Sequence, residues 1–339
     1  MKSEPRTIST DVAAFHPFGW IEYVKHDQIE GTLSRERVIP DSKKGENKHT
    51  GYLSKQACKN IKRALNMMIH LDKLQSEGRQ FKSWVYNTKI GLITLTLPSE
   101  QVHSDNFIKK EILGRFFDML RLDHSIEKYV WKAEAQENGN LHFHIALDKF
   151  IPWRKVRDMW NLHLSHYGYI DAYRDNQLAK YPNGFQLRDD VLWVHPKTKQ
   201  LCTAPPAIQR QRYNKAKADN WSSPNTSDVH KVENVRDLGG YIAEYMSKKD
   251  ESRRAIVGCI WSCSMCLKNT AMRIEICDDM VPEMNYIKEK KAKMVFSDAH
   301  CKVYVWLDPL FDDWPTQLCE KWVTHIKRLM SNQSSLSIY

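Results

Sequence analysis

The sequence predicts an α+β fold in which a central antiparallel β-sheet is flanked by helices. One observation is KYVWKAEAQENGNLHFHIAL, in which two runs of alternating apolar residues are separated by Asn138-Gly139, a dipeptide typical of β-hairpin turns. The other is the flanking sequence, which has apolar residues at the spacing of amphipathic helices. Helical extensions are expected on both sides of this sheet domain.

The chain of 339 residues is long enough for more than one domain. We expect an N-terminal arm and basic helix over 1–85, a central domain over 86–277 and a C-terminal helical extension over 278–339. The central domain is expected to carry an irregular insertion over 174–226, where turn-forming residues cluster. The 51 basic and 41 acidic residues give a net charge of +10, which favours a polyanionic partner without establishing one.

The sequence gives no sign of a membrane protein. No apolar run approaches the ~18 to 20 residues that a membrane span needs, and MKSEPRTISTDVAAFHPFGW lacks the apolar core of a signal peptide. We therefore expect an intracellular protein, cytoplasmic if the host is bacterial, with no membrane partner.

The cysteines are expected to be free thiols, because the eight of them are scattered and the expected compartment is reducing. Cys263 and Cys266 have the spacing of a zinc-binding pair. A structural zinc site needs a second such pair or a matching pair of histidines, and none follows at a suitable spacing. The sequence therefore favours an ordinary strand and loop at these two residues.

The N-terminal elements are predicted as an arm and a helix. Residues 1–50 are polar and rich in turn-forming residues, so a loosely structured arm is expected there. A helix is predicted over 54–76, with Ser54 as its N-cap. One face of this helix is basic, and it either faces solvent or contacts DNA. This face consists of Lys55, Lys59, Lys62 and Arg63.

The elements around the hairpin follow from their apolar patterns. A strand is predicted from Ile93 to Leu97, where apolar residues alternate, and Pro98 ends it. A helix is expected to begin with Asp105 as its cap. Another is expected after the hairpin, with Pro152 at its first position.

The second half of the chain begins with the irregular insertion, which contains QRQRYNKAKADNW. This basic stretch, with a tyrosine and a tryptophan, either contacts the backbone and stacks on the bases of a single strand or is a solvated helix. SDVHKVEN then predicts a strand, and NVRDLGGYIAEYMSKKD predicts a helix capped by Asn234. Residues 252–277 favour strand again, and TQLCEKWVTHIKRLMSN predicts a C-terminal helix.

The hairpin has two possible registers. A two-residue loop would mix polar and apolar partners on both faces. A three-residue loop over Asn138 to Asn140 pairs Ala135 with Phe143 and makes one face wholly apolar. The sequence therefore favours the three-residue loop at these residues.

This register predicts a metal site on the other face. It places Glu134 opposite His144 and Gln136 opposite His142, with opposed Cβ atoms ~5 Å apart. A lone histidine on a strand is more often structural. Two imidazoles and a carboxylate that converge on one face are, however, typical of a divalent-metal site. The candidate metal ligands are therefore His142, His144, Glu134 and Gln136.

The helix predicted after Asn234 contains a candidate nucleophile. Tyr241 and Tyr245 are four residues apart, so they lie on one helix face, and Lys248 continues that face. Tyrosines at this spacing alone are more often half-buried core residues. A phenol, with a pKa of about 10, attacks a phosphodiester at neutral pH only when a cation or base assists its ionisation. Lys248 and a bound metal would provide that assistance.

The order of ITLTLP, the His-x-His strand and the YxxxYxxK helix resembles the HUH endonucleases that initiate rolling-circle replication, over about residues 89–277. The likeness is closest to the two-tyrosine initiators of small phages and plasmids, and it implies the HUH or Rep endonuclease fold, a ferredoxin- or RRM-like sheet. One position departs from the pattern, because Glu244 stands where those proteins often have lysine. The matching positions are the metal ligands His142, His144 and Glu134 and the catalytic residues Tyr245, Tyr241 and Lys248.

The resemblance implies a nickase of single-stranded origin DNA that uses Mg²⁺ or Mn²⁺ and forms a 5′-phosphotyrosine bond. The released 3′-OH would prime a host polymerase. A host helicase would unwind the duplex, because the chain has no GxxxxGK[ST] loop. The alternatives are an HUH transposase, a relaxase, which usually carries a third histidine, or a DNA-binding regulator without catalysis. Which tyrosine cleaves first, the recognised DNA and the oligomeric state are not predicted.

Overall fold

The structure is a computed structural model, and it divides the chain into two compact units. Unit 1 comprises Met1–His49, Lys62–Phe81 and Cys263–Tyr339, and unit 2 comprises Thr50–Ile61 and Lys82–Ser262. Each unit is described by itself. The structure describes residues 6–16, 19–29, 50–75, 90–198, 200–231, 253–268, 271–307, 318, 320–322, 324–325 and 328.

The predicted fold class is confirmed, because antiparallel sheets are flanked by helices in an α+β arrangement. The predicted domain boundaries at 85 and 277 remain predictions. No helix among the described residues is long and apolar enough to cross a membrane.

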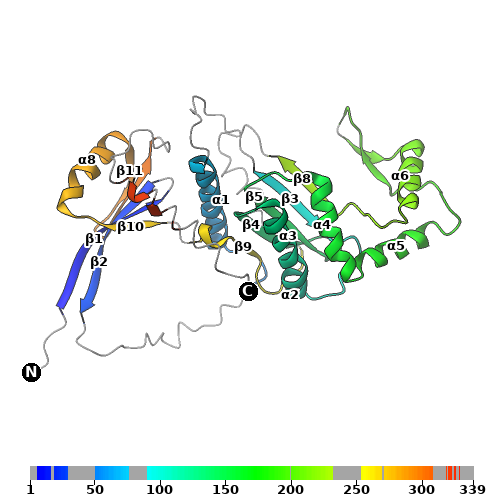
Figure 1. Cartoon of the computed structure of the whole chain (residues 1–339), viewed down its shortest axis with the longest axis horizontal. Coiled ribbons are helices and arrows are strands. Elements are labelled where there is room, and N and C mark those ends of the chain that lie inside the picture. Colours follow the sequence, from blue (N-terminus) through cyan, green and yellow to red (C-terminus); the bar gives the residue numbers. More distant parts are fainter. Residues whose placement is uncertain are drawn as a thin grey trace, which may run out of the picture. The chain divides into compact units, whose positions relative to one another are not determined.

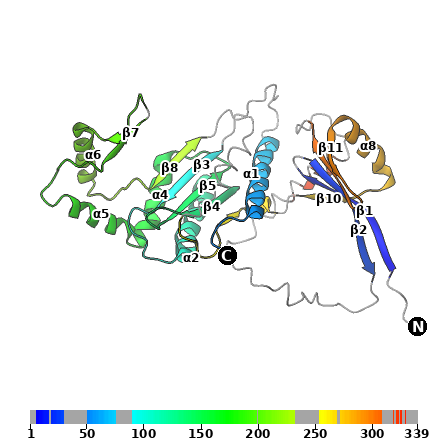
Figure 2. The same ribbon diagram turned by 180° about the vertical axis from the view of Figure 1, so that it is seen from behind.

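The sheet of unit 2 has the strand order β8-β3-β5-β4-β9 (Figure 2). Both predicted strands of the hairpin are present, and β5 lies between β4 and β3. The strand predicted near Ile93 is β3, and the one predicted in SDVHKVEN is β8. The strands are β3 (Gly91–Thr96), β4 (Tyr129–Ala135), β5 (Leu141–Leu147), β8 (Ser227–Lys231) and β9 (Trp261–Cys263).

Helices cover one face of this sheet (Figure 1). They are α2 (Asp105–Phe107), the π-helical turn η2 (Ile108–Leu113), α3 (Gly114–His124) and α4 (Trp153–His166). Trp160 of α4 is fully buried, contacts the rings of Phe116 and Phe143, and donates a 2.8 Å hydrogen bond to the carbonyl of Thr96. The apolar residues of β5 therefore pack against the helices, which leaves the opposite face to the polar residues of the strand.

The cap of the first of these helices differs from the prediction. Ser104 is the N-cap, because its hydroxyl accepts a hydrogen bond from the Phe107 amide. Asp105 is only 4% exposed and instead forms two hydrogen bonds with the guanidinium of Arg254. The expectation that Asp105 caps the helix was therefore wrong, because an ion pair with a residue far along the chain takes its carboxylate.

The predicted irregular insertion contains regular elements. Helix α5 (Tyr169–Lys180) follows α4, and helix α6 (Pro206–Ala218) contains most of the basic stretch QRQRYNKAKADNW. Between them, β6 (Leu192–Val194) and β7 (Leu201–Thr203) pair as an antiparallel hairpin. The expectation of an irregular segment was therefore wrong for these four stretches.

Unit 1 contains a second sheet with the strand order β10-β1-β2-β12-β11. The loosely structured arm expected over 1–50 was wrong for Arg6–His16 and Gly19–Ile29, because these residues form β1 and β2. The predicted C-terminal helical extension likewise contains two strands. The remaining elements are β10 (Met272–Glu275), α8 (Val281–Lys290), β11 (Ala292–Ser297), β12 (Cys301–Trp306) and the short 3-10 turns Met265–Leu267 and Asp278–Met280.

An aromatic stack explains why these strands escaped prediction. Trp20 of β2 is 1% exposed, and its ring centroid lies 4.4 Å from that of Tyr304 and 4.7 Å from that of Trp306. Phe15 of β1 stacks on Trp20 at 5.8 Å. The partners come from opposite ends of the chain, so no local pattern announces the pairing.

The predicted terminal helices are confirmed where they are described. Helix α1 (Lys55–Gln75) has Ser54 as its N-cap, and the Ser54 hydroxyl accepts a 3.1 Å hydrogen bond from the Ala57 amide. Residues 318, 320–322, 324–325 and 328 are helical, as the C-terminal pattern predicts. The helix predicted in NVRDLGGYIAEYMSKKD lies outside the described residues.

The packing of Phe143 yields a prediction about stability. Phe143→Ala should lower the free energy of unfolding of unit 2 by about 3–5 kcal/mol, because the substitution leaves a cavity between β5 and α4. Hydrogen exchange of the β5 amides in a urea series would measure it. The control is Val102→Ala, since Val102 is 75% exposed and its truncation should change stability by no more than about 0.5 kcal/mol. Equal effects of the two substitutions would contradict the described core.

Candidate metal centre

The face of the unit 2 sheet opposite the helices carries polar residues of adjacent strands. In the ladder, Glu134 is opposite His142 and Lys132 is opposite His144. On the other side of β5, Thr94 is opposite His144. Directly opposed residues share a face of a sheet, so these five side chains lie on one face. The predicted division into an apolar and a polar face is confirmed.

The register of the hairpin differs from both predicted alternatives. The Gln136 amide donates a hydrogen bond to the Asn140 carbonyl, so the turn comprises residues 137–139 and not 138–140. Gly139 has φ = +82°, a conformation that favours glycine. Glu134 is therefore opposite His142, not His144, and Gln136 is not opposite His142. The difference is two residues, so the side chains keep their predicted faces.

Asn140 explains this register. Its side chain is 3% exposed, donates a 2.8 Å hydrogen bond to the Ser99 carbonyl and accepts one of 2.9 Å from the Gln101 amide. These bonds hold Asn140 at the end of β5, so it is unavailable for the turn. They connect the hairpin to the segment after β3, and the sequence of the hairpin alone contains no sign of them.

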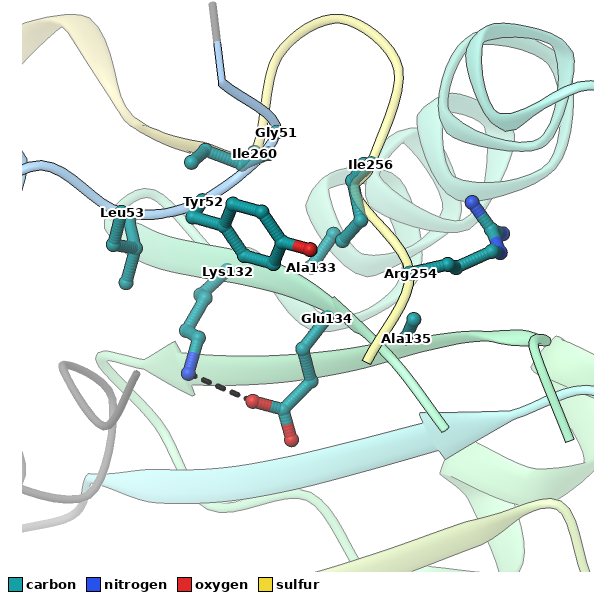
Figure 3. A pocket seen from close by; sticks show the side chains of 10 residues that line it. All are labelled: Gly51, Tyr52, Leu53, Lys132, Ala133, Glu134, Ala135, Arg254, Ile256 and Ile260. Atoms are coloured by element: carbon teal, nitrogen blue, oxygen red, sulfur yellow. Dashed lines mark hydrogen bonds and ion pairs between the residues drawn. The ribbon is translucent and has the colours of Figure 1, made fainter. Parts of the chain in front are cut away.

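Glu134 and His144 meet although they are not directly opposed. The Glu134 Oε1 atom lies 2.7 Å from His144 Nε2, and Oε2 accepts a 2.8 Å hydrogen bond from the ammonium group of Lys132. Figure 3 shows the ion pair between Lys132 and Glu134 on β4. The prediction omitted Lys132, although its position two residues before Glu134 places it on the same face.

Glu134, His142 and His144 bring one ligand atom each within 4.8 Å of one another, and no other such group of three His, Cys, Asp or Glu occurs among the described residues. The two imidazole centroids are 4.6 Å apart. The His142 Nδ1 atom is buried and has no hydrogen-bond partner in the described part of the chain. A buried polar atom without a partner is costly, and a metal ion would satisfy it. These residues therefore fit a divalent cation.

Charges and burial give two of these groups the protonation states that metal binding requires. Burial would raise the pKa of Glu134, but the hydrogen bonds and charges of His144 and Lys132 lower it to about 2. Burial, with the charge of His144, lowers the pKa of His142 to about 4. At neutral pH Glu134 is therefore a carboxylate, and the His142 imidazole keeps a free lone pair.

Other groups on this face support the histidines. The Thr94 hydroxyl lies 3.3 Å from His144 Nδ1 and orients the ring, as the partners of metal-binding histidines do. On β8, Asp228 is opposite Thr94, and its Oδ2 atom lies 2.8 Å from Nε2 of His230. The prediction omitted Thr94, Asp228 and His230. Their alternation on β3 and β8 is the signal that could have identified them.

Gln136 follows Glu134 by two residues and lies beyond the paired part of β4, so its role as a fourth ligand stays a prediction. Cys263 and Cys266 are buried and do not belong to the three-residue group. Burial raises the pKa of the Cys263 thiol to about 11, which disfavours the thiolate that zinc binds.

A small cavity of about 30 Å³ lies beside β4 (Figure 3). Its walls include Tyr52, Lys132, Glu134 and Ile256. This volume suffices for one or two water molecules and excludes a nucleotide. A large substrate would therefore reach Glu134 from the polar face of the sheet.

The segment that begins at Arg253 is anchored to the hairpin. Arg253 donates a 3.0 Å hydrogen bond to the Ala135 carbonyl, and Arg254 donates to the Gly139 carbonyl. The ion pair of Arg254 with buried Asp105 holds the same segment against α2. Tyr241, Tyr245 and Lys248 lie outside the described residues, so their position relative to the histidines is untested.

Comparison with known families gives one match. Residues 91–250 match the model of a family of replication-associated proteins that is described by its member ORF2. The matched region includes β3, β4, β5 and β8 and all three residues of the candidate metal centre. The match supports a Rep-like protein with a role in the initiation of replication. Comparisons with curated proteins and with solved structures gave no match.

Metal titration tests the ligand set. His142→Ala should lower the affinity for Mn²⁺ by about 100-fold, because it removes a ligand from a three-residue site. Gln136→Ala should leave the affinity within about twofold, because the observed register moves Gln136 away from His142. Isothermal titration calorimetry measures both. His230→Ala is the matched control, as His230 is an exposed histidine on the same sheet face, and a loss as large as that of His142→Ala would contradict the site.

The low pKa of His142 predicts a pH dependence of stability. Between pH 6.5 and 4 the unfolded chain binds a proton at His142 that the folded protein does not bind. The free energy of unfolding without metal should therefore fall as the pH is lowered through this window, by about 2 kcal/mol from this residue. Urea unfolding in chelator at several pH values measures it. The same dependence in His142→Asn would show that other groups cause the fall.

Proposed function

We propose that this protein initiates rolling-circle replication as a metal-dependent endonuclease that nicks and rejoins single-stranded origin DNA. The observation that carries the proposal is the group of Glu134, His142 and His144 on the polar sheet face. It lies within the region that matches replication-associated proteins.

In this proposal Glu134, His142 and His144 hold a divalent cation, with Gln136 as a candidate fourth ligand. Carboxylate and imidazole ligands together suit Mg²⁺ or Mn²⁺. When bound, the ion polarises the scissile phosphate and stabilises the negative charge of the transition state. Lys132 keeps Glu134 ionised, and Thr94 orients His144.

Tyr245 is the proposed nucleophile. Its phenolic oxygen bonds to phosphorus while the bond from phosphorus to the 3′ oxygen breaks. The phenol loses its proton, and the departing oxygen gains one to become the 3′-OH. Lys248 is the proposed cation that favours ionisation of the phenol. Tyr241 would attack the regenerated origin in the next round, while Tyr245 still holds the first 5′ end.

The described ends of the tyrosine segment support this assignment. Lys231 ends β8 at one edge of the sheet, and Arg253 contacts β4 two strands beyond β3. The strands between them are β3 and β5, and β5 carries both histidines. Residues 232–252 thus connect opposite sides of the candidate metal centre, and this stretch is easily long enough for the distance.

The partners follow from the proposed reaction. The free 3′-OH suits a host DNA polymerase, which extends such primers. Rejoining needs no ATP, because the phosphotyrosine bond conserves the energy of the phosphodiester. Duplex unwinding would need a separate helicase of the host.

Incubation with single-stranded origin DNA tests the proposal. The wild-type chain with Mn²⁺ should form a covalent protein–DNA adduct, visible after denaturing electrophoresis, and chelator should prevent it. Tyr245→Phe should abolish the adduct because it lacks the nucleophilic oxygen. Tyr241→Phe is the matched control, since it removes the same atom from the other tyrosine and should retain the first cleavage. DNA binding without any adduct would instead indicate a regulator.

A further inference from the structure

The insertion in unit 2 forms a small folded module that the proposed nicking reaction does not use. We call residues 181–221 the α6 module. They include the β6–β7 hairpin and helix α6, which lie beyond β8 and away from β4 in both views (Figures 1 and 2). Seven Lys or Arg residues and three Asp residues occur in this stretch, so it is strongly basic.

The aromatic residues of the α6 module form its core. Tyr213 is 9% exposed and Trp221 is 6% exposed, and their rings contact each other. Tyr213 also contacts the rings of Tyr181 and Phe185. The predicted stacking of bases on the tyrosine and tryptophan was therefore wrong, because burial makes their faces unavailable. What the helix presents to solvent is positive charge.

The cations of α6 have no carboxylate partner in the part of the chain that the structure describes. They are Arg210, Arg212, Lys215 and Lys217, all exposed, and the helix contains no acidic residue. Other cations of unit 2 do form ion pairs, such as Arg188 with Asp190 and Arg174 with Asp171. Four uncompensated charges on one helix repel one another, so they favour a polyanion that would neutralise them.

Two of these cations also hold the α6 module together. Arg212 donates a 3.2 Å hydrogen bond to the Leu192 carbonyl of β6, and Arg210 lies 4.6 Å above the ring of Phe185. The buried side chain of Gln209 forms hydrogen bonds with the carbonyls of Arg188 and Ala204. Helix and hairpin are therefore connected, and Lys215 and Lys217 can be changed without breaking these contacts.

The hairpin presents an apolar face beside the basic helix. Leu192, Val194 and Leu201 are 53%, 52% and 65% exposed. Val194 is opposite Leu201 and Leu192 is opposite Thr203, so all four side chains share one face. The turn between the strands carries Lys197. An exposed apolar ribbon with a basic turn, joined to a basic helix, is suited to the grooves and phosphates of DNA.

We propose that the α6 module binds duplex DNA next to the strand that is nicked. The major groove admits an α-helix or a two-stranded ribbon, and the module has both, held together by the contacts of Arg212 and Gln209. The burial of its aromatic rings disfavours a single strand, and its charge disfavours a second copy of this chain. The inference extends the proposed function, because it specifies where the duplex beside the cleavage site is held.

Fluorescence anisotropy with a labelled duplex of mixed sequence tests this inference on the full chain. Wild type should bind the duplex more tightly than either separate strand, with an affinity that falls as salt rises. Lys215→Gln with Lys217→Gln should weaken duplex binding and lower the slope of log K against log salt by about 2. The matched control is Arg115→Gln with Arg121→Gln, which removes the same charge from ion-paired residues of α3 and should keep the slope.

Three outcomes would overturn the inference: an unchanged slope in the lysine variant, equal losses in the control variant, or tighter binding of the single strand. Dimerisation that Leu201→Gln abolishes without any effect on duplex binding would also overturn it, because the hairpin would then bind another copy. His142→Ala should bind the duplex like wild type while it loses adduct formation. Failure of the proposed nicking reaction is therefore distinguishable from failure of this inference.

Discussion

The position of β5 between β3 and β4 is the constraint on which unit 2 depends. Successive side chains of a strand point to opposite faces, so Phe143 is fully buried against Trp160 while His142 and His144 point to the other face. Both neighbouring strands supply partners to the histidines, with Glu134 from β4 and Thr94 from β3. The same pairing therefore stabilises the core and assembles the candidate metal centre.

The end of the hairpin is held by groups from elsewhere in unit 2, and this connects the metal centre to the segment that follows residue 252. Asn140 is bound to the chain after β3, and the Gly139 carbonyl accepts a hydrogen bond from Arg254. Arg254 in turn pairs with Asp105, whose pKa is lowered, because the hydrogen bonds from Arg254 and Val257 outweigh the effect of burial. A buried pair of this kind is costly to break, so it restricts both the turn and the segment that leads into the candidate nucleophile region.

Two kinds of surface divide the chemistry of unit 2. The sheet face concentrates imidazoles and a carboxylate, which suit a metal ion and, through it, one phosphate. The α6 module presents cations without carboxylate partners in the described part of the chain, which suit many phosphates of a backbone at once. Most of the sheet of unit 1 lies outside the region matched by the family model, and strands from both ends of the chain build it around Trp20.

The sequence by itself determined what depends on local periodicity and on residue type: the helix after Ser54, the strands of the hairpin, the faces of β5, and the identity of Glu134, His142 and His144 as a possible ligand group. Residue alternation needs no knowledge of distant contacts. Only the tertiary structure decided the register, the cap at Ser104, the part of Lys132, the burial of Tyr213 and Trp221, and the strands of unit 1. Each of these depends on contacts between residues far apart in the chain, such as Asn140 with Ser99, Asp105 with Arg254 and Trp20 with Tyr304. Such contacts form only when the chain has folded, so no local pattern encodes them.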